Sequence, residues 1–442
     1  MNEELKLQTV NEKIPINIDN DTILNINTKS VNELTHGFHK YPGKYIPQIP
    51  NWAIKKYLNS NKTNTIIDPF CGSGTTLIEG LTDGNNVIGV DIDPLSVLIS
   101  KVKTTHIDTE KFDKISKWII KEIKDNSVKG QFIPKIETLN HWFTQEAIEK
   151  LSKIRFLIEN IPAKFDSNEN IKNAFYICFS SIIRRVSNAD NQSQKTYVSH
   201  TKIKTPTEVY SLFSIQLKHY QERFNDFAIK TDKKFKSEVI NTSSSEKISK
   251  ILKNRTIDLA ITSPPYIKAI DYIYNQMVEL FWIGDLFEME TQSKQNILKN
   301  QYIGNKQIKK IEYSDYSPFN NKTNIHQLDI TLKQIFTLDK KNGQKHAYIT
   351  RKYFAEMENH FAEMNIVLKP KIHYIMVVGD STVSGIYVDT ANIISEIAEK
   401  KEFKLINKWG YKIKNRYMRF DRKGRGGIIN IDWVLDFERI KK

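Results

Sequence analysis

Two short runs of the 442-residue chain combine residue types that could do chemistry. The first, DPFCGSGTT at residues 68–76, places two glycines between an apolar stretch and a stretch with helical spacing. Glycines at a strand-to-helix turn let the backbone approach a ligand, and the following helix N-terminus favours a carboxylate or a phosphate. A second acid, Asp91, lies 23 residues after Asp68, which suits binding of ribose hydroxyls. The pattern predicts a site for an adenosine-bearing cofactor.

Details of this first run select the cofactor. The glycines at positions 72, 74 and 80 depart from the G-x-G-x-x-G pattern of dinucleotide sites, and no Gly-Lys-Ser/Thr follows for a triphosphate. Asp68 would repel a pyrophosphate but suits the amino group of a methionyl moiety. A glycine pair that merely turns the chain is the simpler alternative, and the flanking strand, helix and acids weigh against it. We therefore expect S-adenosylmethionine and no metal. The expected cofactor-binding residues in this region are Asp68, Pro69, Phe70, Gly72, Gly74, Thr75, Thr76, Asp91 and Ile92.

The second run, Ser263-Pro264-Pro265-Tyr266, directly follows the apolar stretch IDLAIT. Two prolines fix the backbone and remove two N–H donors, so acceptor oxygens remain at the end of a strand, where α/β proteins bind ligands. An exocyclic base amine is a poor nucleophile because its lone pair is delocalised into the ring. If the Ser263 hydroxyl and the Pro264 carbonyl each accept one amine hydrogen, the lone pair can localise and attack a methyl sulfonium. Tyr266 would stack on a base rotated out of its duplex. Taken alone, the run is equally compatible with an ordinary turn.

Charge and cysteine usage limit the class of protein. Lys and Arg number 66 against 51 Asp and Glu, which gives a net charge of +15. This excess favours a polyanionic partner, although a solvated surface explains the charge alone equally well. Two cysteines cannot form a disulfide framework, and the polar N-terminus lacks the apolar core of a signal peptide. We expect a cytoplasmic protein whose partner is nucleic acid and not a membrane.

Strand and helix patterns alternate around both runs and predict an α/β fold with a mostly parallel sheet. Two polar or helical stretches interrupt this alternation. The expected divisions are an arm at 1–30, a catalytic domain at 31–106 and 237–442, a helical insertion at 107–236 and a second insertion at 284–345.

Together, DPFCGSGTT, GVDIDP and DLAITSPPY resemble the motifs of the DNA amino-methyltransferases, which modify cytosine N4 or adenine N6. HGFHKYPGKYIP at residues 36–47 resembles the further motif that packs over the methionine end of the cofactor, which adds His39 and Tyr41 to the cofactor candidates. The resemblance spans most of residues 36–105 and 237–437. It implies a Rossmann-like class I methyltransferase domain with a seven-stranded type of sheet, and it implies that Ser263, Pro264, Pro265 and Tyr266 are catalytic.

The residue at the first position of the second run bears on the target base. Members of this family with Ser there are mostly cytosine-N4 enzymes, while Asp or Asn usually marks adenine-N6 enzymes, so Ser263 favours cytosine. Adenine N6 remains the alternative, because a hydroxyl and a carboxylate can each accept an amine hydrogen. The chain departs from the family at the third strand, where Asn241, Thr242 and Ser243 replace the usual acid that binds the adenine of the cofactor.

Three polar stretches carry the residue types that read DNA bases and bind phosphates. The first stretch, residues 184–195, includes Arg184, Arg185 and Asn188. The second is residues 294–322. The third, residues 416–425, includes Arg416 and Arg419. A solvated surface is the alternative for each. The insertion at 107–236 is the first choice for target recognition.

The predicted function is site-specific methylation of a flipped base in double-stranded DNA, with cytosine N4 preferred. A cognate restriction endonuclease, if one accompanies the enzyme, would be a separate chain. The alternatives are adenine-N6 methylation of DNA, methylation of an RNA base, and a catalytically silent DNA-binding module. The intact glycine loop, acid and SPPY run argue against the last.

Overall fold

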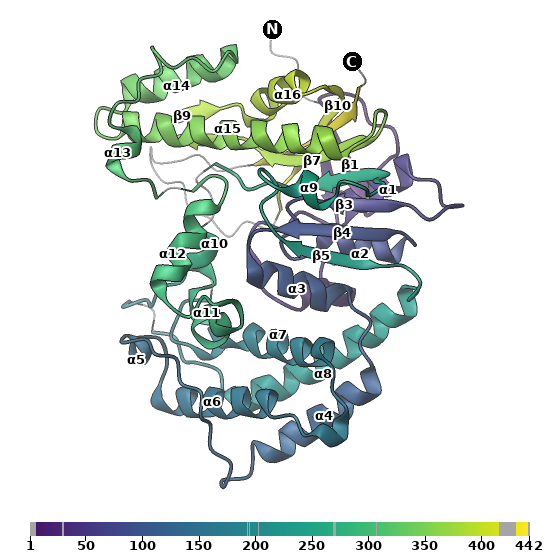
Figure 1. Cartoon of the computed structure of the whole chain (residues 1–442), viewed down its shortest axis with the longest axis vertical. Coiled ribbons are helices and arrows are strands. Elements are labelled where there is room, and N and C mark those ends of the chain that lie inside the picture. The colour runs from purple at the N-terminus through teal and green to yellow at the C-terminus, as the bar shows by residue number, and fades with distance from the viewer. Residues whose placement is uncertain are drawn as a thin grey trace.

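The computed structural model describes residues 6–28, 31–191, 193, 195–201, 203–267, 271–305, 307–414 and 430–440. Within these ranges the central sheet has nine strands in the order β1-β2-β10-β11-β7-β6-β3-β4-β5 (Figure 1). The strands are β1 (Leu7–Asn11), β2 (Ile23–Asn27), β3 (Thr65–Asp68), β4 (Asn86–Asp91), β5 (Ser237–Asn241), β6 (Leu259–Thr262), β7 (His373–Gly379), β10 (Phe403–Lys412) and β11 (Ile431–Arg439). A separate hairpin consists of β8 (Ser381–Val383) and β9 (Ile386–Val388).

All neighbouring strands of this sheet are parallel except β11, which runs antiparallel to both β7 and β10. The seven strands from β5 to β10 in spatial order match the expected class I methyltransferase sheet, so the predicted α/β fold is confirmed. The N-terminal segment, expected as an arm, adds β1 and β2 beyond β10. Leu24 and Ile26 of β2 are buried in the same apolar cluster as Trp52 and Trp409, and this burial explains why the segment pairs with the sheet.

Neighbouring strand residues point to opposite faces of the sheet, and each face has its own helices. Ile66 and Ile375 belong to an apolar cluster with residues of α1 (Gln48–Tyr57), α2 (Thr75–Thr82) and α3 (Pro94–Thr104). Ile67 and Tyr374 belong to a cluster with residues of α9 (Ile248–Ile251), α14 (His326–Leu338), α15 (Gly343–Val367) and α16 (Thr390–Lys400). The strands are apolar on both sides because both faces are covered.

A second, helical body lies below the sheet in Figure 1. The segment expected as a helical insertion contributes α4 (Thr109–Glu122), α5 (Leu139–Trp142), α6 (Gln145–Glu159), α7 (Glu169–Val186) and α8 (Val209–Lys230). These share one apolar cluster with α10 (Tyr272–Asn275) and α11 (Met277–Ile283), where the fully buried Trp282 packs against Phe143 and Phe179. Residues 107–236 and the stretch after the SPPY run therefore build a common core.

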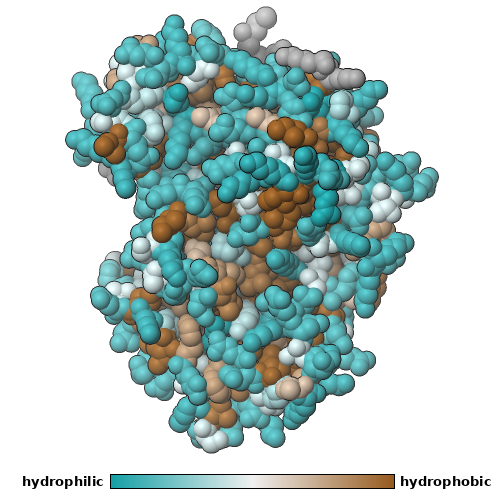
Figure 2. All heavy atoms as spheres, viewed as in Figure 1, coloured by the Kyte–Doolittle hydropathy of each residue, from teal (hydrophilic) through white to brown (hydrophobic). Residues whose placement is uncertain are grey.

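The segment expected as the second insertion divides between the two bodies. Its first part, η3 (Gly284–Phe287) and α12 (Gln292–Gln301), lies with the helical body, whereas α13 (Lys310–Tyr313) and α14 lie with α15 above the sheet (Figure 1). Short 3-10 turns are also present as η1 (Leu34–Gly37) and η2 (Ala163–Phe165). On the face shown in Figure 2, apolar residues gather across the middle of the molecule while hydrophilic ones cover both ends. None of the described helices is long and apolar enough to cross a bilayer.

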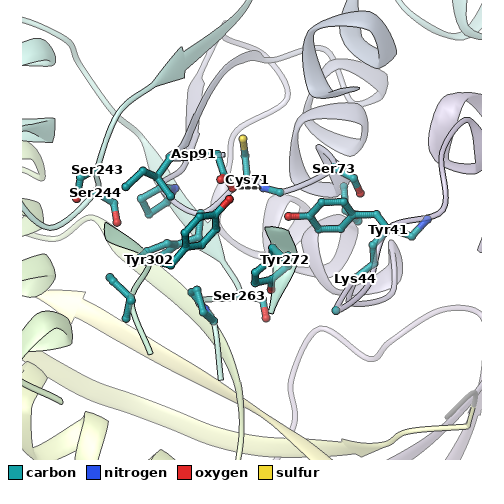
Figure 3. Close-up of a pocket in the computed structure, with 18 of the residues that line it drawn as sticks. Tyr41, Lys44, Cys71, Ser73, Asp91, Ser243, Ser244, Ser263, Tyr272 and Tyr302 are labelled. Carbon is teal, nitrogen blue, oxygen red and sulfur yellow. Dashed lines mark hydrogen bonds between the residues drawn. The ribbon is translucent and has the colours of Figure 1, made fainter. Parts of the chain in front are cut away.

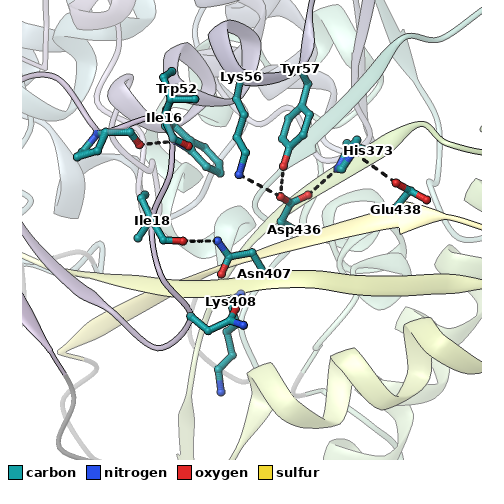
Figure 4. A network of polar contacts seen from close by, with 12 residues as sticks. Ile16, Ile18, Trp52, Lys56, Tyr57, His373, Asn407, Lys408, Asp436 and Glu438 are labelled. Carbon is teal, nitrogen blue, oxygen red and sulfur yellow. Dashed lines mark hydrogen bonds and ion pairs between the residues drawn. The ribbon is translucent and has the colours of Figure 1, made fainter.

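A polar network fastens α1 to the amino end of β7 and the carboxyl end of the antiparallel strand β11 (Figure 4). Asp436 of β11, which is fully buried, accepts hydrogen bonds from Tyr57 and from Nδ1 of His373 (2.8 Å), and the Nζ of Lys56 lies 3.8 Å away. Nearby, the indole of Trp52 donates to the Pro15 carbonyl at 3.0 Å. One carboxylate thus joins a helix and two strands at the sheet end opposite to the SPPY run.

Replacing Asp436 with alanine should lower the free energy of unfolding by about 3–5 kcal/mol, because it removes a fully buried carboxylate and leaves several half-buried donors without their acceptor. Urea denaturation would measure this change. Glu438→Ala is the matched control, since its carboxylate lies 3.8 Å from His373 and its side chain is 34% exposed; it should cost less than about 1 kcal/mol. Equal losses in the two variants would contradict a role for the buried network.

Candidate cofactor and catalytic site

A pocket of about 710 Å³, partly open to solvent, lies at the carboxyl ends of β3, β4, β5 and β6 (Figure 3). The pocket brings together residues from both sequence runs. From the expected cofactor residues its lining includes Tyr41, Pro69, Phe70, Gly72, Thr75, Asp91 and Ile92, and from the expected catalytic residues it includes Ser263 and Pro265.

Backbone conformation explains the two glycines of the loop. Gly72 (φ 49°) and Gly74 (φ 82°) are left-handed, a conformation that glycine adopts without steric cost. A Cβ atom on Gly72 would lie 3.0 Å from the Tyr41 ring, and one on Gly74 would lie 3.0 Å from the Ser100 hydroxyl oxygen. Ser100 also donates to the Gly72 carbonyl at 2.7 Å. Close packing against Tyr41 and Ser100 therefore leaves no room for a side chain at either glycine.

Asp91 ends β4 and organises the next turn. Its carboxylate accepts the N–H of Gly72 at 2.8 Å and the N–H of Asp93 at 2.9 Å. Asp93 then caps α3 by accepting the N–H of Leu95 at 2.9 Å, with Pro94 at the first helical position. Burial, with a smaller contribution from the charge of Asp93, raises the pKa of Asp91 to about 7. The acid that lines the pocket is thus held by the glycine loop itself.

Asp68 does not line the pocket, contrary to the expectation that it meets the methionyl amine. It is 1% exposed, and its carboxylate accepts hydrogen bonds from Thr76 (2.6 Å), Thr262 (2.6 Å) and the Phe70 N–H (3.1 Å). Burial raises its pKa to about 6. Thr262 immediately precedes Ser263. The hydrogen bonds of Asp68 therefore connect the glycine loop to the start of the SPPY run. Gly74 and Thr76 also lie outside the lining.

His39 is packed inside the protein and outside the pocket lining. Its Nδ1 donates to the Lys40 carbonyl at 2.9 Å, so its Nε2 accepts from the Ser180 hydroxyl at 3.0 Å. Burial lowers its pKa to about 4, and the ring is neutral at physiological pH. The cofactor contact expected of His39 is replaced by a structural link to α7.

The SPPY run presents Ser263 and Pro265 to the pocket, while Pro264 is buried. Tyr266 lies behind them, where its hydroxyl donates to Asp432 of β11 at 2.7 Å. Tyr411 donates to the other carboxylate oxygen of Asp432 at 3.0 Å. Burial and Asp432 raise the pKa of Tyr266. Its ring is consequently anchored to the antiparallel strand, a link that no sequence motif signalled.

Three tyrosines form an aromatic wall along the pocket. The Tyr41 and Tyr272 rings are 5.8 Å apart at 29°, and the Tyr272 and Tyr302 rings are 5.9 Å apart at 14°. Tyr302 follows α12, so the segment expected as the second insertion contributes directly to the pocket. Tyr272 stands within the family resemblance, but no motif marked Tyr302.

Two buried serine hydroxyls at opposite ends of the pocket have no hydrogen-bond partner among the described residues. They belong to Ser73, which is 2% exposed, and Ser244, which is 4% exposed. Figure 3 places Ser73 with Tyr41 and Lys44, and Ser244 beyond Asp91 on the other side. Burial lowers the pKa of Lys44 to about 8. A buried hydroxyl is normally paired, so an elongated ligand with polar groups at both ends fits this pocket.

Of the DNA-contacting candidates, Arg184 faces inward. It is 7% exposed, and its guanidinium donates to the carbonyls of Asp190 (3.0 Å), Ser193 (2.9 Å) and Lys195 (2.9 Å). Arg184 thus holds the loop that follows α7, and its expected DNA contact stays a prediction. Arg185 is exposed, and Asn188 donates to the His141 carbonyl at 3.1 Å. Arg416 and Arg419 lie outside the described residues.

Replacing Arg184 with alanine should free the loop at 188–203 and lower the free energy of unfolding by about 2–4 kcal/mol, since hydrogen bonds to charged groups are worth more than neutral ones. Limited proteolysis should then cut first in this loop, and denaturation would give the stability change. Arg184→Lys keeps the charge but lacks the branched guanidinium group that reaches three carbonyls. Its loop should therefore be cut nearly as fast as that of the alanine variant. Resistance of both variants would contradict this role.

A family model described as DNA methylase, of the N6 and N4 type, matches residues 14–101. This match covers the glycine loop, Asp91 and the upstream motif of the pocket. Residues 14–101 thus match the N6/N4 DNA methylase family, the family that the sequence motifs resemble. S-adenosylmethionine is accordingly its cofactor, as predicted.

Individual proteins are similar to this chain over different lengths. The chain is 29% identical over 418 residues to the type II methyltransferase M.MvaI of Kocuria varians, which covers 89% of this chain and 87% of the relative. It is 36% identical over 151 residues to the type II methyltransferase M.MjaII of Methanocaldococcus jannaschii. This match covers 32% of this chain and 28% of the relative. Among solved structures, the rRNA methyltransferase aviRa from Streptomyces viridochromogenes gives a TM-score of 0.29 at 9% identity, covering 90% of this chain and 88% of that one.

Proposed function

We propose that this protein is a type II DNA methyltransferase that modifies the exocyclic amine of a flipped base, with cytosine N4 preferred. The observation that carries the proposal is the joint lining of one pocket by Ser263 and Pro265, the glycine loop and Asp91. Similarity to the type II methyltransferases M.MvaI and M.MjaII supports the type II assignment. A restriction endonuclease of the same specificity would be a separate chain.

The cofactor end of the reaction is held by this chain's own groups. Asp91 is placed to accept ribose hydroxyl hydrogens, and the Lys44 ammonium and the Ser73 hydroxyl stand where a methionyl carboxylate would need donors. When bound, S-adenosylmethionine supplies an electrophilic methyl group on a sulfonium. The wall of Tyr41, Tyr272 and Tyr302 keeps water from one side of the pocket.

The acceptor end depends on the SPPY run. The prolines leave no N–H donors there, so the Ser263 hydroxyl and the Pro264 carbonyl accept the two amine hydrogens and direct the lone pair of the nitrogen. Tyr266, fixed by Asp432, supports the target base as a rigid ring. A serine hydroxyl in this position favours cytosine N4, and adenine N6 is the second candidate.

We place the DNA along the loop that follows α7. Arg184 holds this loop from inside, and Lys204 donates to the carbonyls of Ser187 (2.6 Å) and Ala189 (3.0 Å). The Thr196 hydroxyl donates to the Asn275 carbonyl at 2.9 Å, which sets the loop beside the segment that carries Tyr272. A rigid polar loop next to the pocket suits reading of bases around the flipped one. The helical body formed by residues 107–236 is, on this proposal, the target-recognition domain.

A methyl-transfer assay with labelled cofactor tests the proposal. Duplex DNA should become labelled, and binding should weaken steeply as salt rises, because phosphate contacts release counterions. Label in RNA but not in duplex DNA would support an RNA methyltransferase instead. Binding of cofactor and DNA without any transfer would show a catalytically silent module.

A further inference from the structure

The end of the pocket beyond Asp91 is built differently from what the family resemblance implies. The family's usual acid after the third strand is replaced here, and β5 ends in Asn241, followed by Thr242, Ser243 and Ser244. Asn241 cannot substitute for that acid, because its amide donates to the carbonyls of Asp91 (3.0 Å) and Ile92 (2.9 Å) and does not line the pocket. These bonds place the end of β5 directly beside the ribose-binding acid.

Among the three hydroxyl residues, Ser244 is the one whose hydroxyl is both buried and unpaired, whereas Thr242 is half-buried. The Ser243 hydroxyl lies 3.1 Å from the Ser245 hydroxyl, so these two satisfy each other. The Ser244 hydroxyl is buried, lines the pocket and has no partner among the described residues. An unpaired buried hydroxyl on a residue that lines a pocket is explained when a ligand completes its hydrogen bond.

The backbone of Ser244 is held firmly from the core. Nδ1 of His360 on α15 donates to the Ser244 carbonyl at 3.2 Å, since a carbonyl can only accept. Nε2 of His360 therefore accepts from the Tyr374 hydroxyl of β7 at 2.6 Å. Burial lowers the pKa of His360 to about 4, so the ring stays neutral and keeps this tautomer. The Phe70 ring, which lines the pocket, is 4.7 Å from the imidazole.

We propose that the Ser244 hydroxyl binds the polar edge of the cofactor's nucleobase and makes this site tolerant of a 6-oxopurine in place of adenine. A carboxylate can only accept hydrogen bonds, so it selects the 6-amino group and repels a 6-oxo group. A hydroxyl rotates: it accepts from the amino group of adenine, or donates to the oxygen of hypoxanthine. The proposal rests on the function proposed above only in taking S-adenosylmethionine as the ligand.

Calorimetric binding of S-adenosylhomocysteine and S-inosylhomocysteine tests this without any methyl transfer. The two dissociation constants should differ by less than about fivefold for the unaltered protein, because Ser244 forms one neutral hydrogen bond with either base. Ser244→Ala should weaken both by about 2- to 12-fold, the range that such a bond is worth. Ser243→Ala, whose hydroxyl already has a partner, should change neither.

Ser244→Asp should restore selection, with the inosyl compound bound at least about 30-fold more weakly than the adenosyl compound, since the oxo group then faces a carboxylate. Thermal melting of each variant verifies that it is folded. Unchanged affinities in Ser244→Ala, or rejection of the inosyl compound by the unaltered protein, would overturn the proposal. Tight binding of both compounds by a protein that does not methylate DNA would instead overturn the proposed function, and this inference would remain.

Discussion

Replacing Ser263 with alanine should lower the rate of methyl transfer to DNA by roughly 100- to 1,000-fold, the loss seen when one preorganised hydrogen bond to a reacting group is removed. Ser263 lines the pocket beside the glycine loop, and the methyl side chain of alanine offers no acceptor in place of its hydroxyl. Without that acceptor, the amine lone pair stays delocalised in the ring. Single-turnover kinetics with saturating cofactor would measure the chemical step.

The same variant should bind S-adenosylhomocysteine within about twofold of the unaltered protein, because the loss of a group that acts only on the target amine leaves ground-state cofactor binding intact. Ser243→Ala is a matched control: it removes a hydroxyl from the lining of the same pocket without touching the SPPY run. A rate unchanged by Ser263→Ala, or one lowered equally by the control, would contradict the catalytic role of Ser263.

Replacing Asp91 with alanine should weaken cofactor binding by about 100-fold, since a carboxylate that accepts ribose hydroxyls makes charge-assisted hydrogen bonds of about 1.5–3 kcal/mol each. The variant also frees the N–H groups of Gly72 and Asp93, which the carboxylate now fixes. Isothermal titration calorimetry with S-adenosylhomocysteine would give the change.

Binding by the unaltered protein should depend on pH through Asp91. Its pKa is about 7 without ligand, and ribose hydroxyls favour the ionised carboxylate, so binding lowers this pKa and releases a proton below pH 7. Affinity should therefore rise as the pH increases from about 6 to about 8 and then level off. Asp91→Asn leaves Asp68 and Lys44 in place and should lose this rise. If the affinity of the two proteins depended on pH in the same way, a group other than Asp91 would be responsible for the rise.

The predictability of this molecule from its sequence differs between its elements. Alternating apolar segments around DPFCGSGTT and SPPY predict the sheet correctly, because buried parallel strands need continuous apolar runs. The N-terminal strands β1 and β2 lack such a run and depend on burial beside Trp52 and Trp409. The pairing of β2 with β10, and of β1 with β2, could be found only from the tertiary structure.

Side-chain direction explains the errors at the site. Asp68 and Asp91 both end strands, yet Asp68 points behind the loop toward Thr76 and Thr262 while Asp91 faces the pocket. Residue type alone cannot distinguish these two positions. Tyr302 and Ser244 reach the pocket from segments without a recognisable motif, so only the packing of the chain reveals them.

Sequencing that detects modified bases, applied to DNA from cells producing this protein, tests the central claim most directly. We expect N4-methylcytosine at a recurring short sequence, and its absence when the cells produce the Ser263→Ala variant. DNA without any new modified base would contradict methylation of DNA by this chain. N6-methyladenine in place of N4-methylcytosine would contradict the assignment of cytosine as the target.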